Sequence, residues 1–261
     1  MAAPADIPGI RSGAEPIDLQ GGNSHGVLLL HGFGDTPQTL QLLARAIHGA
    51  GYDVVAPLLP GHGTTVDAFI KSRRSEWLGA ARDELAKLTS THRHVSVGGL
   101  SMGGALAAIL ASETRGLTSA VMMAPYLNMP PRLKVLSASH WLWGHVAGTR
   151  ASRNPGSILD DAERAKNLGY GVYTGRLIYE LWRLATKARV GLPKIKIPTL
   201  LLQSRADSRL ASAIAENAFA VIGSKEKKLV WIEGAGHIIT VDYGREKVFD
   251  EVKSWLAAHP A

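Results

Sequence analysis

Short apolar runs alternate with amphipathic segments along most of this chain of 261 residues, and this alternation constrains its fold more than any other feature. The runs are β-branched or leucine-rich and have the length of buried strands. The predicted strands are residues 27–30, 54–56, 95–98, 119–124, 199–203 and 229–232. Continuously apolar strands that alternate with helices form a parallel sheet covered on both faces. Right-handed crossovers place the carboxyl ends of all strands at one edge, where sites form.

The segments between the strands carry apolar residues at helical spacing. Thr36 precedes Pro37 as an N-cap residue precedes a proline in the first helical turn, and Ser75 is predicted to open a second helix. The apolar stripes are Leu40, Leu43 and Ile47; Leu78, Ala81, Leu85 and Leu88; Leu210, Ile214, Ala218 and Val221; and Val248, Val252, Trp255 and Leu256. Each stripe predicts a helix that packs on the sheet.

Residues 126–190 interrupt this rhythm. The segment has no convincing strand and contains Trp141, Trp143 and Trp182. It also carries ten Lys or Arg and four Asp or Glu, so that it holds +6 of the net charge of +7. We interpret it as a mostly helical insertion into one α/β core formed by residues 1–125 and 191–261.

The basic charge raises the question of nucleic acid, but no zinc-finger, RNP or helix-turn-helix signature accompanies it. We therefore expect no nucleic-acid partner. No apolar run approaches the length of a membrane span, and the first residues lack the basic and apolar regions of a signal peptide. A cytoplasmic location is the expectation, although a secreted chain already trimmed of its signal would read the same.

The strongest chemical signal is residues 99–103, Gly-Leu-Ser-Met-Gly, between a predicted strand and the helical run 105–111. This is the G-x-S-x-G nucleophile elbow in the strand–turn–helix context that it requires. Ser101 would occupy a strained turn, and side chains two residues to either side would collide with neighbouring backbone. The following helix would direct its N-terminal amides at the reacting centre.

A serine hydroxyl needs a base, and ten histidines compete for that role. In elbow enzymes the chain order is serine, acid, histidine, which leaves His237 and His259. His259 lies near the C-terminus and is predicted to be a solvated tail residue. His237 follows the strand 229–232 in a glycine-containing loop, and is the predicted base.

The acid is predicted to follow the preceding strand. Asp207 lies four residues beyond the run 199–203 and would hold the histidine in the correct tautomer. Glu233 and Asp242 are rivals, but both lie too close to His237 in the chain to occupy a separate strand end. We interpret Asp242 as structural.

Acyl transfer also requires donors for the oxyanion. The predicted donors are the backbone N–H groups of Met102, which follows the nucleophile, and of Phe33, in the loop after the first predicted strand. Their side chains are read as walls of an acyl pocket. His31 and His62 are interpreted as buried, hydrogen-bonded loop residues. The sequence contains no metal-ligand motif and no cysteine, and no G-x-G-x-x-G dinucleotide-binding motif follows the first predicted strand. We therefore expect neither a metal nor a cofactor.

Taken together, five motifs resemble those of the α/β-hydrolases, and more narrowly the small bacterial carboxylesterases and monoacylglycerol lipases. They are residues 31–34 (His-Gly-Phe-Gly), 60–63 (Pro-Gly-His-Gly), 99–104 (Gly-Leu-Ser-Met-Gly-Gly), 203–207 (Gln-Ser-Arg-Ala-Asp) and 236–242 (Gly-His-Ile-Ile-Thr-Val-Asp). The resemblance covers about residues 25–125 and 195–257. It implies Ser101, Asp207 and His237 as a catalytic triad and the amides of Phe33 and Met102 as the oxyanion hole. It also implies that residues 126–190 are a lid over the acyl pocket, and this lid is unusually basic and rich in tryptophan. Its Arg and Lys side chains would face water, and we predict that its tryptophans and leucines line the acyl channel. The leucines are Leu133, Leu136, Leu142, Leu177, Leu181 and Leu184.

The predicted activity is that of a serine carboxylic ester hydrolase that forms an acyl-enzyme on small ester substrates such as monoacylglycerols. The basic lid would allow weak contact with a lipid interface. Hydrolysis of amides, thioesters or carbon–carbon bonds, and perhydrolysis, are alternatives on the same scaffold. A ligand-binding protein that retains a triad is an alternative from another class.

Overall fold

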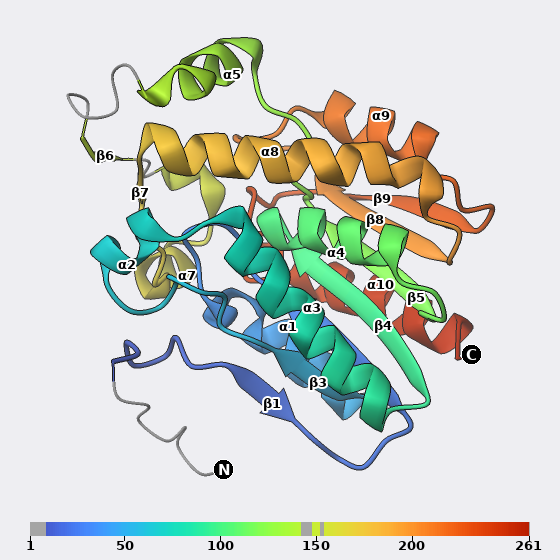
Figure 1. Ribbon diagram of the computed structural model, residues 1–261. Coiled ribbons are helices and arrows are strands. Elements are labelled where there is room, and N and C mark those ends of the chain that lie inside the picture. Colours follow the sequence, from blue (N-terminus) through green and yellow to red (C-terminus); the bar gives the residue numbers. More distant parts are fainter. Residues whose placement is uncertain (1–8, 142–147, 152–153, 261) are drawn as a thin grey trace.

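A single seven-stranded sheet forms the centre of the molecule in the computed structural model, which describes residues 9–141, 148–151 and 154–260 (Figure 1). The strand order is β1-β3-β2-β4-β5-β8-β9, and every neighbouring pair is parallel except β1 with β3. The strands are β1 (Ile17–Leu19), β2 (His25–Leu30), β3 (Asp53–Ala56), β4 (His94–Leu100), β5 (Ser119–Met123), β8 (Thr199–Ser204) and β9 (Lys227–Ile232). All six predicted strands are present, and the predicted α/β class with a mostly parallel sheet is confirmed.

Helices cover both faces of this sheet (Figure 1). The described helices and 3₁₀ turns are η1 (Pro37–Leu40), α1 (Gln41–Gly49), α2 (Val66–Lys71), α3 (Arg74–Thr91), α4 (Met102–Glu113), α5 (Pro131–Ala138), η2 (Pro155–Ser157), α7 (Asp161–Lys166), α8 (Gly175–Gly191), η3 (Leu192–Lys194), α9 (Ser212–Val221) and α10 (Arg245–Ala258). Side chains alternate between the faces of a strand. Leu28 therefore joins a core formed with α3, α4, α8 and α9, whereas Leu29 joins one formed with α1 and α10.

Two predicted helix starts differ in detail from the structure. Thr36 does precede a helical turn, but the turn is η1 and the Thr36 hydroxyl makes no capping bond. The helix predicted from Ser75 begins at Arg74, where the Glu76 side chain accepts the N–H of Arg73 at 2.8 Å. This bond satisfies the backbone N–H of the N-cap residue at the helix start.

Residues 126–190 leave the sheet after β5. Besides α5, η2, α7 and α8, the segment contains an antiparallel pair, β6 (Arg150–Ala151) and β7 (Val172–Tyr173), which was not predicted. The helix α8 packs against α4 and places Leu177, Leu184 and Ala188 in the core. Much of α8 thus belongs to the helical layer on that face of the sheet. Within the described residues, no helix is both long and apolar enough to span a bilayer.

Candidate active site

Ser101 lies in a strained turn between β4 and α4. Its backbone has φ 55° and ψ −113°, a conformation that a non-glycine residue adopts only under constraint. The Ser101 N–H donates to the Met123 carbonyl at 2.9 Å, which attaches the turn to the neighbouring strand. The turn thus holds the serine at the carboxyl edge of the sheet.

The two elbow glycines are required by close backbone contacts. A Cβ on Gly99 would lie 2.2 Å from the carbonyl oxygen of Gly103, and a Cβ on Gly103 would lie 1.8 Å from that of Leu30. Both distances are far below van der Waals contact, so that any side chain would push the turn out of place. The predicted collision is therefore confirmed.

Three side chains from separate loops meet at this edge. His237 Nε2 lies 2.8 Å from Ser101 Oγ, and His237 Nδ1 lies 2.7 Å from Asp207 Oδ2. Because an ionised carboxylate only accepts, Nδ1 carries the proton and Nε2 is free to accept from the serine hydroxyl. The histidine and aspartate side chains are only 6% and 1% exposed, so that water competes little for these bonds.

Asp207 is held ionised by its neighbours. Burial alone would raise its pKa, but hydrogen bonds from His237 and from the backbone amides of Arg209 and Leu210, together with the charge of His237, outweigh burial. The net effect lowers the pKa of Asp207 below its usual value. The Gln203 side chain donates a further bond to Asp207 at 2.8 Å.

The two rival acids lie outside this chain of hydrogen bonds. Glu233 is at the surface and pairs with Arg205 at 3.2 Å. Asp242 is completely buried and accepts four backbone N–H groups, those of Leu159, Asp160, Gly236 and Tyr243, at 2.6–2.9 Å. The structural interpretation of Asp242 is confirmed, and its bond to Gly236 anchors the loop that carries His237.

Three other histidines were interpreted from the sequence, and the structure describes all of them. His31 and His62 are buried and bond the carbonyls of Gly32 and Pro60 at 2.9 and 3.0 Å, as predicted. Burial lowers the pKa of both, that of His62 to about 4. The prediction for His259 is wrong: its side chain is only 8% exposed, because it packs on Trp255 and pairs with Glu226.

The two residues predicted to form the oxyanion hole, Phe33 and Met102, lie in different surroundings. Phe33 lines the cavity that Ser101 opens into, and Met102 is the first residue of α4. The N-terminal amides of a helix are free to bind an anion. The Met102 side chain, however, is fully buried in the core and does not line the cavity, so that its interpretation as a pocket wall is wrong.

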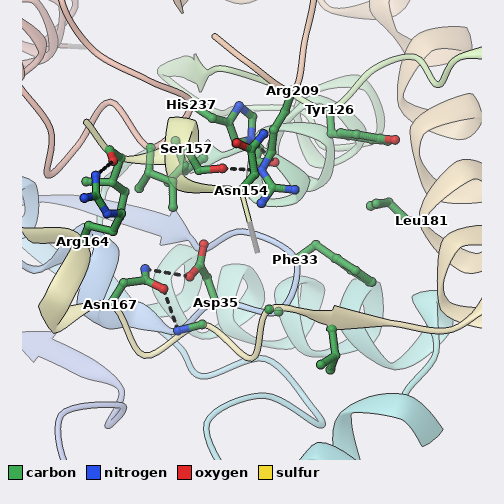
Figure 2. A pocket seen from close by; sticks show the side chains of 18 residues that line it. Phe33, Asp35, Tyr126, Asn154, Ser157, Arg164, Asn167, Leu181, Arg209 and His237 are labelled. Atoms are coloured by element: carbon green, nitrogen blue, oxygen red, sulfur yellow. Dashed lines mark hydrogen bonds between the residues drawn. The ribbon is translucent and has the colours of Figure 1, made fainter. Parts of the chain in front are cut away.

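Ser101 and His237 line a cavity of about 530 Å³. Figure 2 shows this cavity from close by, with His237 labelled. Its lining includes polar residues that the sequence did not single out: Asp35, Tyr126, Asn154, Ser157, Arg164, Asn167 and Arg209. Asn167 Nδ2 donates to Asp35 at 3.1 Å, and Arg209 Nε donates to Ser157 at 2.6 Å. Burial raises the pKa of Asp35 in spite of the Asn167 bond. No local motif marks these residues, since they meet only through the fold.

The predicted apolar lining is largely different from the observed one. Of the leucines predicted to line the channel, Leu181 does so, while Leu177 and Leu184 are in the core and Leu133 is at the surface. Trp141 is 67% exposed, and Trp182 contacts Tyr179. The remaining predicted residues, Leu142, Trp143 and the side chain of Leu136, lie outside the described part of the chain.

The family model described as serine aminopeptidase, S33, matches residues 23–243. The chain belongs to this family. Its match begins before β2 and ends after Asp242, so that it includes the whole sheet except β1 together with Ser101, Asp207 and His237.

Relatives of the chain include lipases and esterases. A thermostable monoacylglycerol lipase from Bacillus sp. (strain H-257) is 29% identical, over 96% of this chain and 97% of the relative. A carboxylesterase from Bacillus subtilis (strain 168) is 25% identical, over 93% and 96% of the two chains. A structure of the metagenome-derived lipolytic enzymes LipS and LipT has 30% identity and a TM-score of 0.88, with 96% of this chain and 100% of that one covered. The family member described here thus has the α/β-hydrolase fold and is a serine hydrolase of the esterase and lipase type.

Proposed function

We propose that the protein hydrolyses carboxylic esters of small alcohols, monoacylglycerols among them, through an acyl-enzyme on Ser101. The observation that carries this proposal is the unbroken hydrogen-bond chain from Ser101 through His237 to Asp207, which opens into the cavity. Monoacylglycerol is proposed because a relative that spans nearly the whole chain is a monoacylglycerol lipase.

In the first half of the proposed reaction, Ser101 Oγ attacks the ester carbonyl while His237 Nε2 takes its proton. The carbonyl π electrons move to oxygen, and the resulting oxyanion accepts hydrogen bonds from the amides of Phe33 and Met102. Asp207 stabilises the imidazolium that forms. When the tetrahedral intermediate collapses, His237 returns the proton to the departing alcohol oxygen and the acyl group stays on Ser101.

In the second half of the proposed reaction, water attacks the acyl-enzyme. His237 takes a proton from the water as it attacks the acyl carbon, and the second tetrahedral intermediate expels Ser101 Oγ, which regains its proton from His237. The products are the free acid and the resting enzyme. Every proton passes through His237 Nε2, and the chemistry requires no other group than those of the chain and water.

The lid role of residues 126–190 is part of the proposal. Its support is that several cavity-lining residues, from Tyr126 to Leu181, come from this segment. The portion between α5 and α8 would then cover the substrate, while α8 itself also packs on the core.

Active-site labelling with a fluorophosphonate tests the nucleophile. We expect one adduct at Ser101 in the native protein and none in Ser101→Ala, whose fold is checked by circular dichroism. A native protein that forms no adduct would overturn the proposal in favour of a ligand-binding role. Losing the nucleophile of such a triad costs on the order of 10⁴–10⁶ in kcat, so that near-native turnover of a short ester by Ser101→Ala would equally contradict it.

A substrate panel separates the reaction classes. It contains p-nitrophenyl esters from acetate to palmitate, monoacylglycerols, and aminoacyl p-nitroanilides, because the family model is described by an aminopeptidase. We expect hydrolysis of the esters and monoacylglycerols with little or no release of nitroaniline. The reverse ranking would replace the ester proposal with amide hydrolysis.

A further inference from the structure

The cavity has two chemically different sides (Figure 2). His237 must protonate the departing alcohol, so the alcohol lies on its side of the cavity, near Ser157, Asn154 and Arg209, which gather around His237 in Figure 2. Phe33, Leu181 and Tyr126 lie together on another side. This mostly apolar side is where the acyl group of the proposed ester would lie.

Tyr126 is rigidly attached to the nucleophile turn. Its backbone N–H donates to the Ser101 carbonyl at 2.9 Å. It follows Pro125, whose ring fixes the backbone, and Ala124, which has a positive φ of 41°. The Tyr126 ring therefore has a defined place relative to Ser101 at the wall of the cavity.

The Tyr126 hydroxyl is the unusual feature of this wall. Within the described residues it has no hydrogen-bond partner, and the half-buried side chain lines the cavity. Burial raises the pKa of Tyr126 to about 12, so that the phenol is neutral and can donate at any working pH. The hydroxyl is thus a donor that the protein leaves available at the cavity, whereas phenylalanine would fill the same space without one.

We propose that Tyr126 Oη is a specificity-determining donor, and that the acyl groups which the enzyme prefers carry an oxygen acceptor part-way along the chain. This inference rests on the proposed ester hydrolysis at Ser101. An oxo, hydroxyl or ether oxygen that reaches Tyr126 gives the phenol the bond that the protein does not supply. An unsubstituted alkyl chain leaves the phenol unpaired.

The chemistry of the wall supports an acceptor in particular. Burial raises the pKa of Tyr126, and the positive charge of Arg209 acts in the opposite direction, so that the phenol lies in a positive potential. A positive potential and a free O–H both favour an oxygen lone pair over an ammonium group. Sites built to hydrogen-bond a substrate group discriminate against analogues that lack it, because their own polar group is then left unpaired.

The test compares p-nitrophenyl octanoate with p-nitrophenyl oxooctanoates in which the oxo group is moved along the chain one carbon at a time. The oxo oxygen only accepts, and the leaving group is constant. We measure kcat/KM for both substrates in the native enzyme and in Tyr126→Phe. The two substrates and the two proteins then form a double cycle. An oxo group also changes the reactivity of the ester carbonyl, but this effect is the same in both proteins, so the change between proteins in the ratio of kcat/KM to that of octanoate isolates the acyl contact. Tyr179→Phe is the matched control, because the Tyr179 hydroxyl bonds Arg183 and does not line the cavity.

We expect one oxo position at which the native ratio exceeds that of Tyr126→Phe by about 3- to 10-fold, the net worth of one hydrogen bond. Tyr179→Phe should keep the native ratios. Ratios that agree within about 2-fold between the native enzyme and Tyr126→Phe at every position would overturn the assignment of Tyr126 alone. Ester hydrolysis that survives in the Ser101→Ala variant would instead overturn the proposed function, and this inference with it.

Discussion

Asp207 and Asp242 are both buried carboxylates near His237, and their surroundings give them different tasks. Asp207 faces the imidazole, while Asp242 faces backbone amides from two segments. In Asp207→Asn the amide would favour the wrong histidine tautomer, and we expect kcat to fall by roughly 10⁴-fold. The check is steady-state hydrolysis of a short p-nitrophenyl ester, with thermal unfolding to show that the variant remains folded.

Asp242→Asn should instead lower stability. One of its oxygens would become an NH₂ group that faces backbone N–H donors, and hydrogen bonds to a charged acceptor are worth about 1.5–3 kcal/mol each. We expect a loss of about 2–4 kcal/mol in the free energy of unfolding. Activity per folded molecule should fall far less than in Asp207→Asn. Urea titration and kinetics of both variants decide the matter, and a reversed kinetic ranking would show that the acid is misassigned.

Some of these residues could be read from the sequence and others could not. Ser101 and its glycines form a contiguous motif whose backbone demands are local, and His237 and Asp207 follow strand ends in a fixed order. Tyr126, Asn167 and Arg209 carry no such signal, because only the folding of residues 126–190 onto the sheet edge brings them together. Only part of Met102 could be read from the sequence. The motif places its backbone amide, but the direction of its side chain depends on how α4 packs.

At the scale of elements, the β4–α4 turn depends on the absence of side chains at two positions. Gly103→Ala would drive a methyl group into the Leu30 carbonyl, and we expect a loss of at least about 3 kcal/mol. Gly79 in α3 provides a matched control, because a Cβ there has open space. Gly79→Ala should stabilise the protein by about 0.5–1 kcal/mol, since it removes a flexible residue from a helix interior. Equal stability of the two variants in chemical denaturation would refute this account.

The amino end of the sheet contains a buried histidine that ties three strands together. His25 on β2 lies 2.9 Å from Ser96 on β4, which in turn lies 2.9 Å from Ser119 on β5. Burial, with smaller effects from His94 and His92, lowers the pKa of His25 from 6.5 to about 4. Between these values the unfolded chain binds a proton that the folded chain does not, so that stability falls as pH decreases through this window.

We therefore expect His25→Gln, which cannot titrate but can still bond Ser96, to lose less stability than the native protein when the pH decreases from about 7 to about 4.5. Urea titrations at both pH values give the comparison. Identical losses in the two proteins would mean that other groups set the acid sensitivity.

Strands in the middle of the sheet were predictable because they are buried on both faces, which leaves an unbroken apolar run. The edge strand β1 was not predicted, since it is short, partly exposed and held only by β3. The β6–β7 pair is shorter still, and its strands pair only because the chain folds back between them. Burial of α8 in the core was also missed, because its cationic residues dominated the reading of its composition, and one of them, Lys187, pairs with Glu113 at the end of α4.

At the scale of the whole molecule, the net charge of +7 is concentrated in residues 126–190. Part of this charge is paired at short range: Lys187 bonds Glu113, and Lys166 bonds Glu163. Arg164 is the cation of this segment that the structure places at the cavity wall within its described part. The charge would either keep an exposed helical surface in solution or attract anionic substrates toward the cavity, and these two roles respond differently to salt.

Long-range attraction weakens once the Debye length becomes shorter than the separation of the charges, and that length is about 8 Å at physiological ionic strength. If the basic segment steers substrates, kcat/KM for an anionic ester should fall by about 3-fold or more between about 20 mM and 500 mM NaCl. The anionic ester is p-nitrophenyl hemisuccinate, and the neutral ester is p-nitrophenyl butyrate, which has the same leaving group and an acyl chain of equal length. The kcat/KM of the neutral ester should change far less with salt. Replacing Arg132 and Lys134 on α5 with glutamate should weaken the salt dependence of kcat/KM for the anionic ester. The same replacement of Lys247 and Lys253 should leave it unchanged, because these residues are on α10, which packs on the opposite face of the sheet. Parallel salt responses of the two esters would leave the charge with a role in solubility alone.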